Sequence, residues 1–211
     1  MKLEGIKANF LGDSITAGVG VPDVKYAYLN VLKDRYGLAV ARNYGISGTR
    51  IARQQTPYSN PSFDRDFCSR VDEMDPDADL VVVFGGTNDF GHGDAPFGTP
   101  DDRTVDTFCG ACHVLMRSLV EKFPAATVVF MTPLHRAVEQ NPAKPCLAAY
   151  VHAIKETAEV YGIPVFDLYA NAGINPQIPA QRELYAADGL HPTVAGAARI
   201  AERLGNFLLS L

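Results

Sequence analysis

Serine and histidine, the residue types of nucleophilic catalysis, each stand in this chain close to an aspartate at a predicted turn. Ser14 follows Gly12 and Asp13 at the end of the apolar run Ile6–Leu11, and a helix-like pattern comes next. A serine in such a place becomes a nucleophile if a base reaches its hydroxyl. The free N–H groups at the start of the next helix can receive negative charge. The stretch alone is equally compatible with Ser14 as a simple helix N-cap.

A base is offered by His191, which stands in the sequence Asp-Gly-Leu-His-Pro immediately before the last predicted helix. Pro192 suits the first position of that helix, and a residue before proline is biased away from helical angles. Asp188 can fold back across Gly189 onto the imidazole ring. A carboxylate bonded to Nδ1 would fix the tautomer and leave Nε2 free to take a hydroxyl proton. Such Asp/His pairs are also common at helix caps, so the spacing by itself leaves a structural role open.

Four other histidines compete for the role of base. His113 and His152 fall within predicted helices, where we expect core-edge or surface positions without a catalytic task. His92 and His135 lie beyond the ends of the third and fourth predicted strands, where they could line a pocket. The sequence does not rank these two.

Five short apolar runs predict the strands of one sheet. The runs are Ile6–Leu11, Leu38–Asn43, Leu80–Phe84, Thr127–Met131 and Ile163–Asp167. Apolar residues recur at helical spacing over Tyr26–Tyr36, Phe63–Glu73, Val105–Phe123, Leu147–Tyr161 and Val194–Leu208. Alternating strands and helices predict a three-layer α/β/α sandwich with a parallel sheet, in one domain over residues 1–211. The loops at 54–62 and 91–100 are expected to form the rim of any pocket.

Acyl transfer also needs hydrogen-bond donors for the negative oxygen that develops on the carbonyl carbon. Gly48 follows the second strand, and its N–H can be approached closely because it has no side chain. Asn88 follows the third strand in Gly85-Gly86-Thr87-Asn88-Asp89 and can offer its amide. The N–H of Ser14 would be a third donor. A turn in which Asn and Asp bond their own backbone is the simpler interpretation of that segment alone.

Taken together, these blocks and their order resemble the SGNH hydrolases, also called the GDSL esterase/lipase family. The resemblance covers nearly the whole chain and departs mildly at Ile15, where the family pattern has leucine. It implies that Ser14 is the nucleophile and that Asp188 and His191 complete the triad. It also implies that Gly48 and Asn88 share the oxyanion hole with the N–H of Ser14. The implied sheet is flavodoxin-like, with strand order 2-1-3-4-5, and no cofactor or metal is expected.

The leading hypothesis is a serine esterase that cleaves short-acyl, acetyl-like carboxylic esters through an acyl-enzyme. Because His191 must be neutral to act as base, activity is expected to rise with pH over roughly 6–7.5. Two alternatives stay open. One is an acyltransferase of the same family, and the other is a flavodoxin-like binding module without catalysis.

The composition of the chain restricts which partners and which cellular location we expect. The formal net charge of −5 over 211 residues argues against a general nucleic-acid or anionic-membrane surface. A small-molecule ester is the partner that the resemblance implies. The sequence contains no run of 18 apolar residues, so no membrane-spanning segment is expected. It also shows no leader-like segment at its start, so we expect a cytoplasmic protein, and a mature secreted form stays open. The sequence does not decide whether copies form a homo-oligomer. Cys109 and Cys112 have metal-ligand spacing, but they continue a helix stripe and are expected to be buried thiols.

Overall fold

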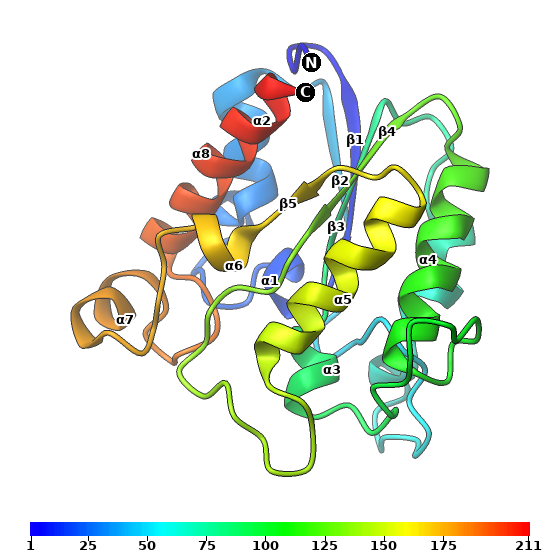
Figure 1. Cartoon of the computed structure of the whole chain (residues 1–211). Coiled ribbons are helices and arrows are strands. Elements are labelled where there is room, and N and C mark those ends of the chain that lie inside the picture. The colour runs from blue at the N-terminus through cyan, green and yellow to red at the C-terminus, as the bar shows by residue number, and fades with distance from the viewer.

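The fold is built on one parallel sheet of five strands. The computed structural model describes residues 1–211, and its strands follow the order β2-β1-β3-β4-β5. Their bounds are β1 Lys7–Gly12, β2 Val40–Gly45, β3 Leu80–Phe84, β4 Thr127–Met131 and β5 Val165–Phe166. Every residue of β3 is buried, as expected for a continuously apolar strand covered on both faces. The expected flavodoxin-like strand order is confirmed (Figure 1).

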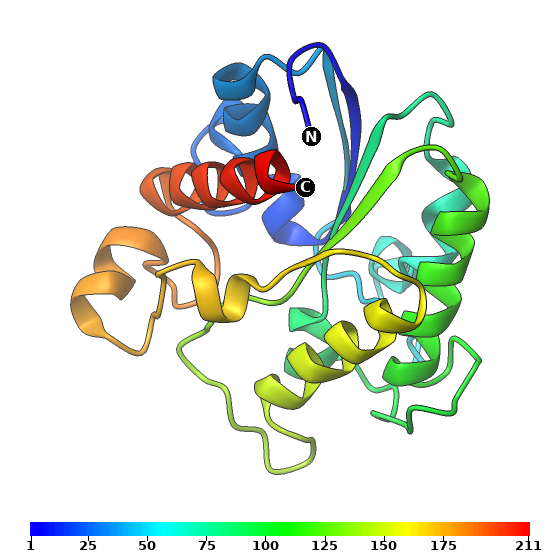
Figure 2. The same cartoon turned by 45° about the horizontal axis from the view of Figure 1, so that its top comes forward.

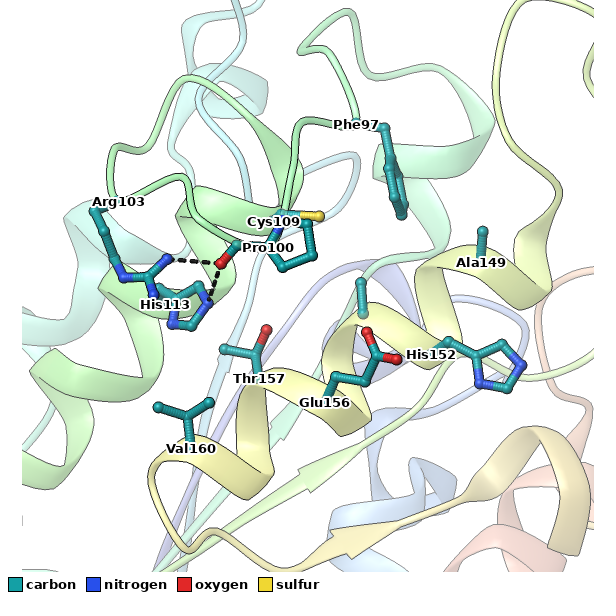
Figure 3. A pocket seen from close by; sticks show the side chains of 11 residues that line it. Phe97, Pro100, Arg103, Cys109, His113, Ala149, His152, Glu156, Thr157 and Val160 are labelled. Carbon is teal, nitrogen blue, oxygen red and sulfur yellow. Dashed lines mark hydrogen bonds between the residues drawn. The ribbon is translucent and has the colours of Figure 1, made fainter.

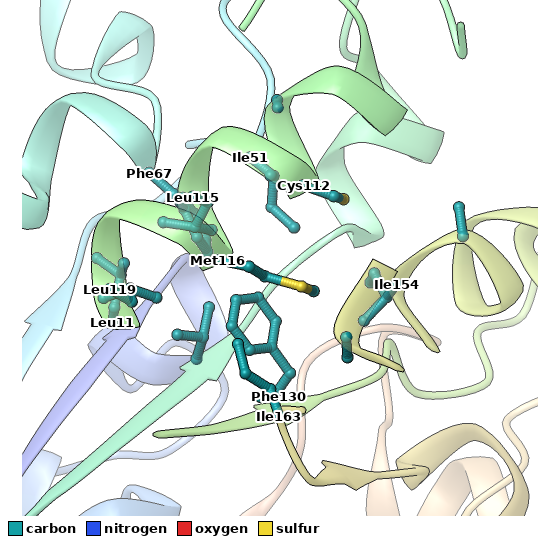
Figure 4. Close-up of a cluster of buried hydrophobic side chains, with 14 of the residues drawn as sticks. Leu11, Ile51, Phe67, Cys112, Leu115, Met116, Leu119, Phe130, Ile154 and Ile163 are labelled. Carbon is teal, nitrogen blue, oxygen red and sulfur yellow. The ribbon is translucent and has the colours of Figure 1, made fainter. Parts of the chain in front are cut away.

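Helices cover both faces of the sheet and give the expected three layers (Figures 1 and 2). On one face lie α2 (Tyr28–Tyr36) and α8 (Val194–Ser210), and on the other lie α4 (Phe108–Lys122) and α5 (Leu147–Val160). Alternate strand residues point to opposite faces. Phe10 and Val82 therefore join the cluster beneath α2 and α8, whereas Leu11 and Val83 join the one beneath α4 and α5. Figure 4 shows the second cluster, where Leu115, Met116 and Leu119 of α4 meet Phe130 of the sheet.

Short helical elements fill the connections at the carboxyl end of the sheet and beside it. They are α1 (Ser14–Ala17), α3 (Thr87–Gly91), α6 (Leu168–Asn171), α7 (Pro179–Tyr185) and the 3-10 helices η1 (Val24–Tyr26), η2 (Pro61–Asp64) and η3 (Cys68–Glu73). The α-helix expected over Phe63–Glu73 is wrong, because η2 and η3 occupy that region. The helices α3, α6 and α7 were not predicted. No helix has both the length and the apolar character needed to cross a membrane.

Strand register brings three distant segments to one edge of the sheet. Gly12, the last residue of β1, pairs with Gly45 on one side and with Phe84 on the other. The residues that follow β1, β2 and β3 therefore emerge side by side. In open parallel sheets this carboxyl edge is where ligands bind.

Candidate active site

Ser14 is the first residue of α1 and lies directly above the end of β1. Its Oγ is 2.9 Å from Nε2 of His191, although 177 positions separate the two residues. The helix cap is Asp13, whose carboxylate accepts the N–H of Ile15 at 3.0 Å. Ser14 is therefore not the cap, which leaves its hydroxyl free to meet the imidazole. The side chain is 7% exposed.

Two glycines allow α1 to begin this close to the sheet. A Cβ on Gly12 would lie 2.0 Å from Oγ1 of Thr16, and one on Gly45 would lie 2.2 Å from the backbone nitrogen of Ala17. Neither distance is compatible with a side chain. The glycine at the end of each strand is thus a packing requirement for the position of Ser14.

Asp188 holds His191 from the side opposite Ser14. Its Oδ2 lies 2.6 Å from Nδ1 of the imidazole, and its Oδ1 accepts the backbone N–H groups of His191 and Leu190 at 2.7 and 2.9 Å. Partial burial raises the pKa of Asp188, but these hydrogen bonds outweigh it and hold the pKa below the usual value. An ionised carboxylate accepts the proton of Nδ1, so Nε2 presents a lone pair to the hydroxyl of Ser14.

Asn88 and the loop after β2 meet at the same edge. Nδ2 of Asn88 donates to the carbonyl of Thr49 at 2.9 Å, which orients the amide and leaves its second N–H without a partner in the protein. Gly48, next to Thr49, has a φ of +75°, a left-handed conformation that favours glycine. The N–H of Ser14 has no acceptor within α1, because it is the first residue of that helix. The structure therefore brings these three predicted donors to neighbouring strand ends.

Asp89 joins the same two segments and was not predicted as a site residue. Its carboxylate accepts the N–H groups of Ile51 and Ala52 at 3.0 and 2.9 Å, and burial raises its pKa. Asn88 and Asp89 thus bond the loop after β2. The segment Thr87–Gly91 is the short helix α3, so the turn considered for it is wrong. The only sequence feature that could have predicted this contact is that Asp89 directly follows Asn88.

Asp13 places a second carboxylate next to the His191 imidazole. It is 2% exposed, and burial raises its pKa to about 6. The hydrogen bond from Ile15 and the attraction of His191 oppose that rise without cancelling it. A buried carboxylate with one backbone partner is costly when ionised.

Three of the histidines named from the sequence lie elsewhere. His135 contacts Glu139 through Nδ1 at 2.7 Å and lies against the ring of Tyr169. Phe97 belongs to a separate cleft of about 450 Å³ between α4, α5 and the segment 97–103 (Figure 3). His113 and His152 line the same cleft, and His113 bonds the carbonyl of Pro100. None of the five principal cavities is lined by Ser14, Asn88 or His191.

The predicted metal-ligand spacing of the cysteines has a structural explanation. Cys109 and Cys112 are 3% and 0% exposed and belong to the hydrophobic cluster beneath α4. Burial raises the pKa of Cys109 to about 11, so the thiol stays protonated at neutral pH. As expected from the helix stripe, both are buried thiols.

The class of protein follows from comparison with known families. The sequence profile of the GDSL-like lipase/acylhydrolase family matches residues 10–199, so the chain belongs to this family and is a carboxylic ester hydrolase. The family assignment excludes the alternative of a non-catalytic flavodoxin-like module.

Solved structures agree with this fold. A protein of Lactobacillus plantarum is 32% identical, with 98% of each chain covered and a TM-score of 0.86. The lipase/acylhydrolase of Enterococcus faecalis is 22% identical over 97% of this chain and 96% of its own, with a TM-score of 0.65. The acetylxylan esterase Axe2 of Geobacillus stearothermophilus is 23% identical over 97% and 94%, with a TM-score of 0.64. No curated protein sequence matches the chain significantly.

Proposed function

We propose that this hydrolase is a serine esterase in which Ser14, His191 and Asp188 form the catalytic triad. The observation that carries the proposal is the continuous chain of contacts from Oγ of Ser14 to Nε2 of His191 at 2.9 Å and from Nδ1 to Asp188 at 2.6 Å. A hydroxyl, a correctly oriented imidazole and an ionised carboxylate in series are what nucleophilic attack on an ester requires.

The reaction proceeds in two halves. Nε2 of His191 takes the proton of Ser14 as Oγ attacks the carbonyl carbon, and the bond to the alcohol oxygen then breaks. The departing alcohol takes the proton from His191 and leaves an acyl-enzyme on Ser14. In the second half, water gives a proton to His191 and attacks the acyl carbon. Ser14 regains its proton as the carboxylic acid is released.

The oxyanion of each tetrahedral intermediate is stabilised by Ser14, Gly48 and Asn88. The N–H of Ser14 and the second N–H of the Asn88 amide both lack partners in the resting protein. The bond from Asn88 to Thr49 holds the amide in place before substrate arrives. Donors that need no reorganisation contribute most to stabilising the transition state.

The substrate we propose is a short acyl group, acetyl-like, on a sugar or lipid-like alcohol. This choice is supported by the finding that Ser14 lines none of the principal cavities, which could otherwise hold a long acyl chain. The name of Axe2, an acetylxylan esterase with the same fold, provides a precedent for an acetylated sugar.

The test is hydrolysis of p-nitrophenyl acetate by the protein, by Ser14→Ala and by Ser118→Ala, a matched control in α4. We expect Ser14→Ala to lose activity by a factor on the order of 10⁴ or more while Ser118→Ala retains it. Equal rates in Ser14→Ala and the unmodified protein would overturn the proposed triad. Turnover that requires an added alcohol acceptor would identify an acyltransferase instead. A series of esters from acetyl to dodecanoyl measures the acyl preference.

A further inference from the structure

A wall of three rings stands beside Gly48. The ring of Phe63 lies 3.1–3.3 Å from the point that a Cβ on Gly48 would occupy, so it packs directly on that glycine. Tyr58 meets Phe63 edge to face, with ring centroids 6.0 Å apart, and meets His92 in the same way at 6.0 Å. Phe63, Tyr58 and His92 thus form a continuous surface, which we call the ring wall. It begins at a proposed oxyanion donor.

The buried guanidinium of Arg50 holds the ring wall together. Arg50 is 2% exposed, and its Nη1 donates to the carbonyl of Gly48 at 2.9 Å while Nη2 donates to the carbonyl of Phe63 at 2.7 Å. The guanidinium also lies over the ring of Tyr58, 5.1 Å from its centroid. Because the guanidinium group is planar and rigid, its hydrogen bonds restrain the segments of Gly48 and Phe63 at the same time. Arg50, which lies in the same loop as Gly48, therefore connects the ring wall to that glycine.

The third residue of the ring wall, His92, is hydrogen-bonded to Asn88, which is another proposed oxyanion donor. Its backbone N–H donates to the carbonyl of Asn88 at 3.0 Å. Nδ1 lies 3.4 Å from Nη1 of Arg50 and 3.1 Å from the hydroxyl of Tyr58. Since a guanidinium only donates, Nδ1 is an acceptor and the proton resides on Nε2. Although His92 is exposed at the surface, partial burial of its ring, followed by the charges of Arg50 and other nearby cations, lowers the pKa of His92 to about 4.

The position of the wall relative to His191 determines which part of a substrate faces it. In both views, α1 with Ser14 lies between the segment that carries Asp188 and His191 and the segment from 46 to 64 (Figures 1 and 2). The departing alcohol oxygen must face His191 to receive its proton. The substituent on the other side of the carbonyl carbon is the acyl group, and it is directed toward the ring wall.

We propose that Tyr58, Phe63 and His92 form the acyl subsite and that this wall, held by Arg50, disfavours long acyl groups such as octanoyl relative to acetyl. The assignment rests on the proposed function of Ser14 and deepens it by naming the residues that set acyl length. Arg50 acts as a positioning residue, because it acts on the substrate through the ring wall and through Gly48 rather than by direct contact. A hydrophobic wall discriminates by about 10- to 200-fold against a methylene that does not fit.

The experiment compares kcat/KM for p-nitrophenyl acetate, butyrate and octanoate in the unmodified protein, Tyr58→Ala and Phe63→Ala. The octanoate-to-acetate ratio is expected to rise about tenfold or more in either variant. Tyr26→Ala is the matched control, because Tyr26 is a partly exposed tyrosine in η1. Its ratio should stay within about twofold of the unmodified value.

Arg50→Lys keeps the positive charge and removes the forked contacts, so it should raise the same ratio. General destabilisation lowers all three rates together and does not change their ratio. If an alanine variant does not fold by circular dichroism, Phe63→Leu and His92→Ala test the wall with smaller changes, each with an expected rise of about threefold or more.

Ratios that stay constant in folded Tyr58 and Phe63 variants would overturn the ring wall as the acyl subsite. So would an unmodified enzyme that prefers octanoate. Both results leave Ser14-dependent hydrolysis intact and are distinct from failure of the proposed triad. That failure would appear as acetate turnover that persists in Ser14→Ala.

Discussion

Asp13 offers the sharpest test of the electrostatics next to Ser14. It caps α1 through one hydrogen bond to the N–H of Ile15, yet it is 2% exposed and carries a pKa raised from 3.8 to about 6 by burial. The substitution Asp13→Asn keeps a side-chain oxygen for the cap and removes the buried charge. The variant should therefore be more stable than the unmodified protein at neutral pH.

The magnitude follows from proton linkage. A folded-state pKa above the unfolded value means that the folded protein binds more protons between pH 3.8 and about 6, so stability falls as pH rises through this window. The shift of about two units corresponds to about 3 kcal/mol of destabilisation at pH 7 and about 1 kcal/mol at pH 4.5. Asp13→Asn should recover most of this at pH 7 and correspondingly less at pH 4.5.

Urea unfolding of both proteins at pH 7 and pH 4.5 measures the difference. Asp23→Asn is the matched control, because Asp23 also caps a helix through its carboxylate, here to Lys25, but is exposed. Burial is absent there, so that variant should gain nothing at pH 7. A gain for Asp13→Asn that is equal at both pH values, or a loss at pH 7, would refute the assignment of the cost to a buried charge. We also expect slower turnover, because the carboxylate attracts the imidazolium that forms at His191 during the reaction.

Other substitutions test the roles of single groups. Asn88→Ala should lower kcat for p-nitrophenyl acetate by about 10²–10³ if its amide is an oxyanion donor; an unchanged kcat would remove it from that role. Asp188→Asn should lower kcat by about 10⁴ through the wrong imidazole tautomer. Because the pKa of Asp188 is held below its usual value, its own ionisation should not appear in the pH profile of kcat/KM over roughly pH 6–7.5, and an ionisation in that range that disappears in Asp188→Asn would contradict this. Gly45→Ala should destabilise by about 3 kcal/mol or more in thermal or urea unfolding, since its Cβ would meet Ala17; a change below 1 kcal/mol would show that α1 can shift.

The layers and the strand order could be predicted because apolar patterning is strong where an element is buried on both sides. β3 and β4 have the same bounds as the predicted runs, Leu80–Phe84 and Thr127–Met131. The carboxyl ends of the strands then had to lie at one edge, which is why the segments after β1, β2 and β3 could be predicted to meet. β5 is shorter than its apolar run: only Val165–Phe166 form ladder pairs with β4.

The short helices could not be predicted for a physical reason. None of the residues of α7 is buried, so Pro179–Tyr185 carries no apolar period. α3 begins after Gly86 at a φ of +100° with polar residues that are buried by bonding the neighbouring loop rather than by packing. Such helices depend on tertiary contacts, which cannot be inferred from the spacing of apolar residues in the sequence.

Side chains that connect the site's loops were also invisible in the sequence, and they explain how the site is held ready. Each of the three segments that carry a proposed oxyanion donor has a backbone carbonyl bonded by an arginine. The pairs are Arg70 with Gly12 at 3.2 Å, Arg50 with Gly48 at 2.9 Å and Arg136 with Thr87 at 3.0 Å. Hydrogen bonds from a charged guanidinium to a backbone carbonyl are strong and directional, so they restrain the backbone at these positions. Because these bonds lie within the protein itself, the donors are held in place before the negative oxygen forms, which is the condition under which hydrogen-bond donors accelerate acyl transfer most.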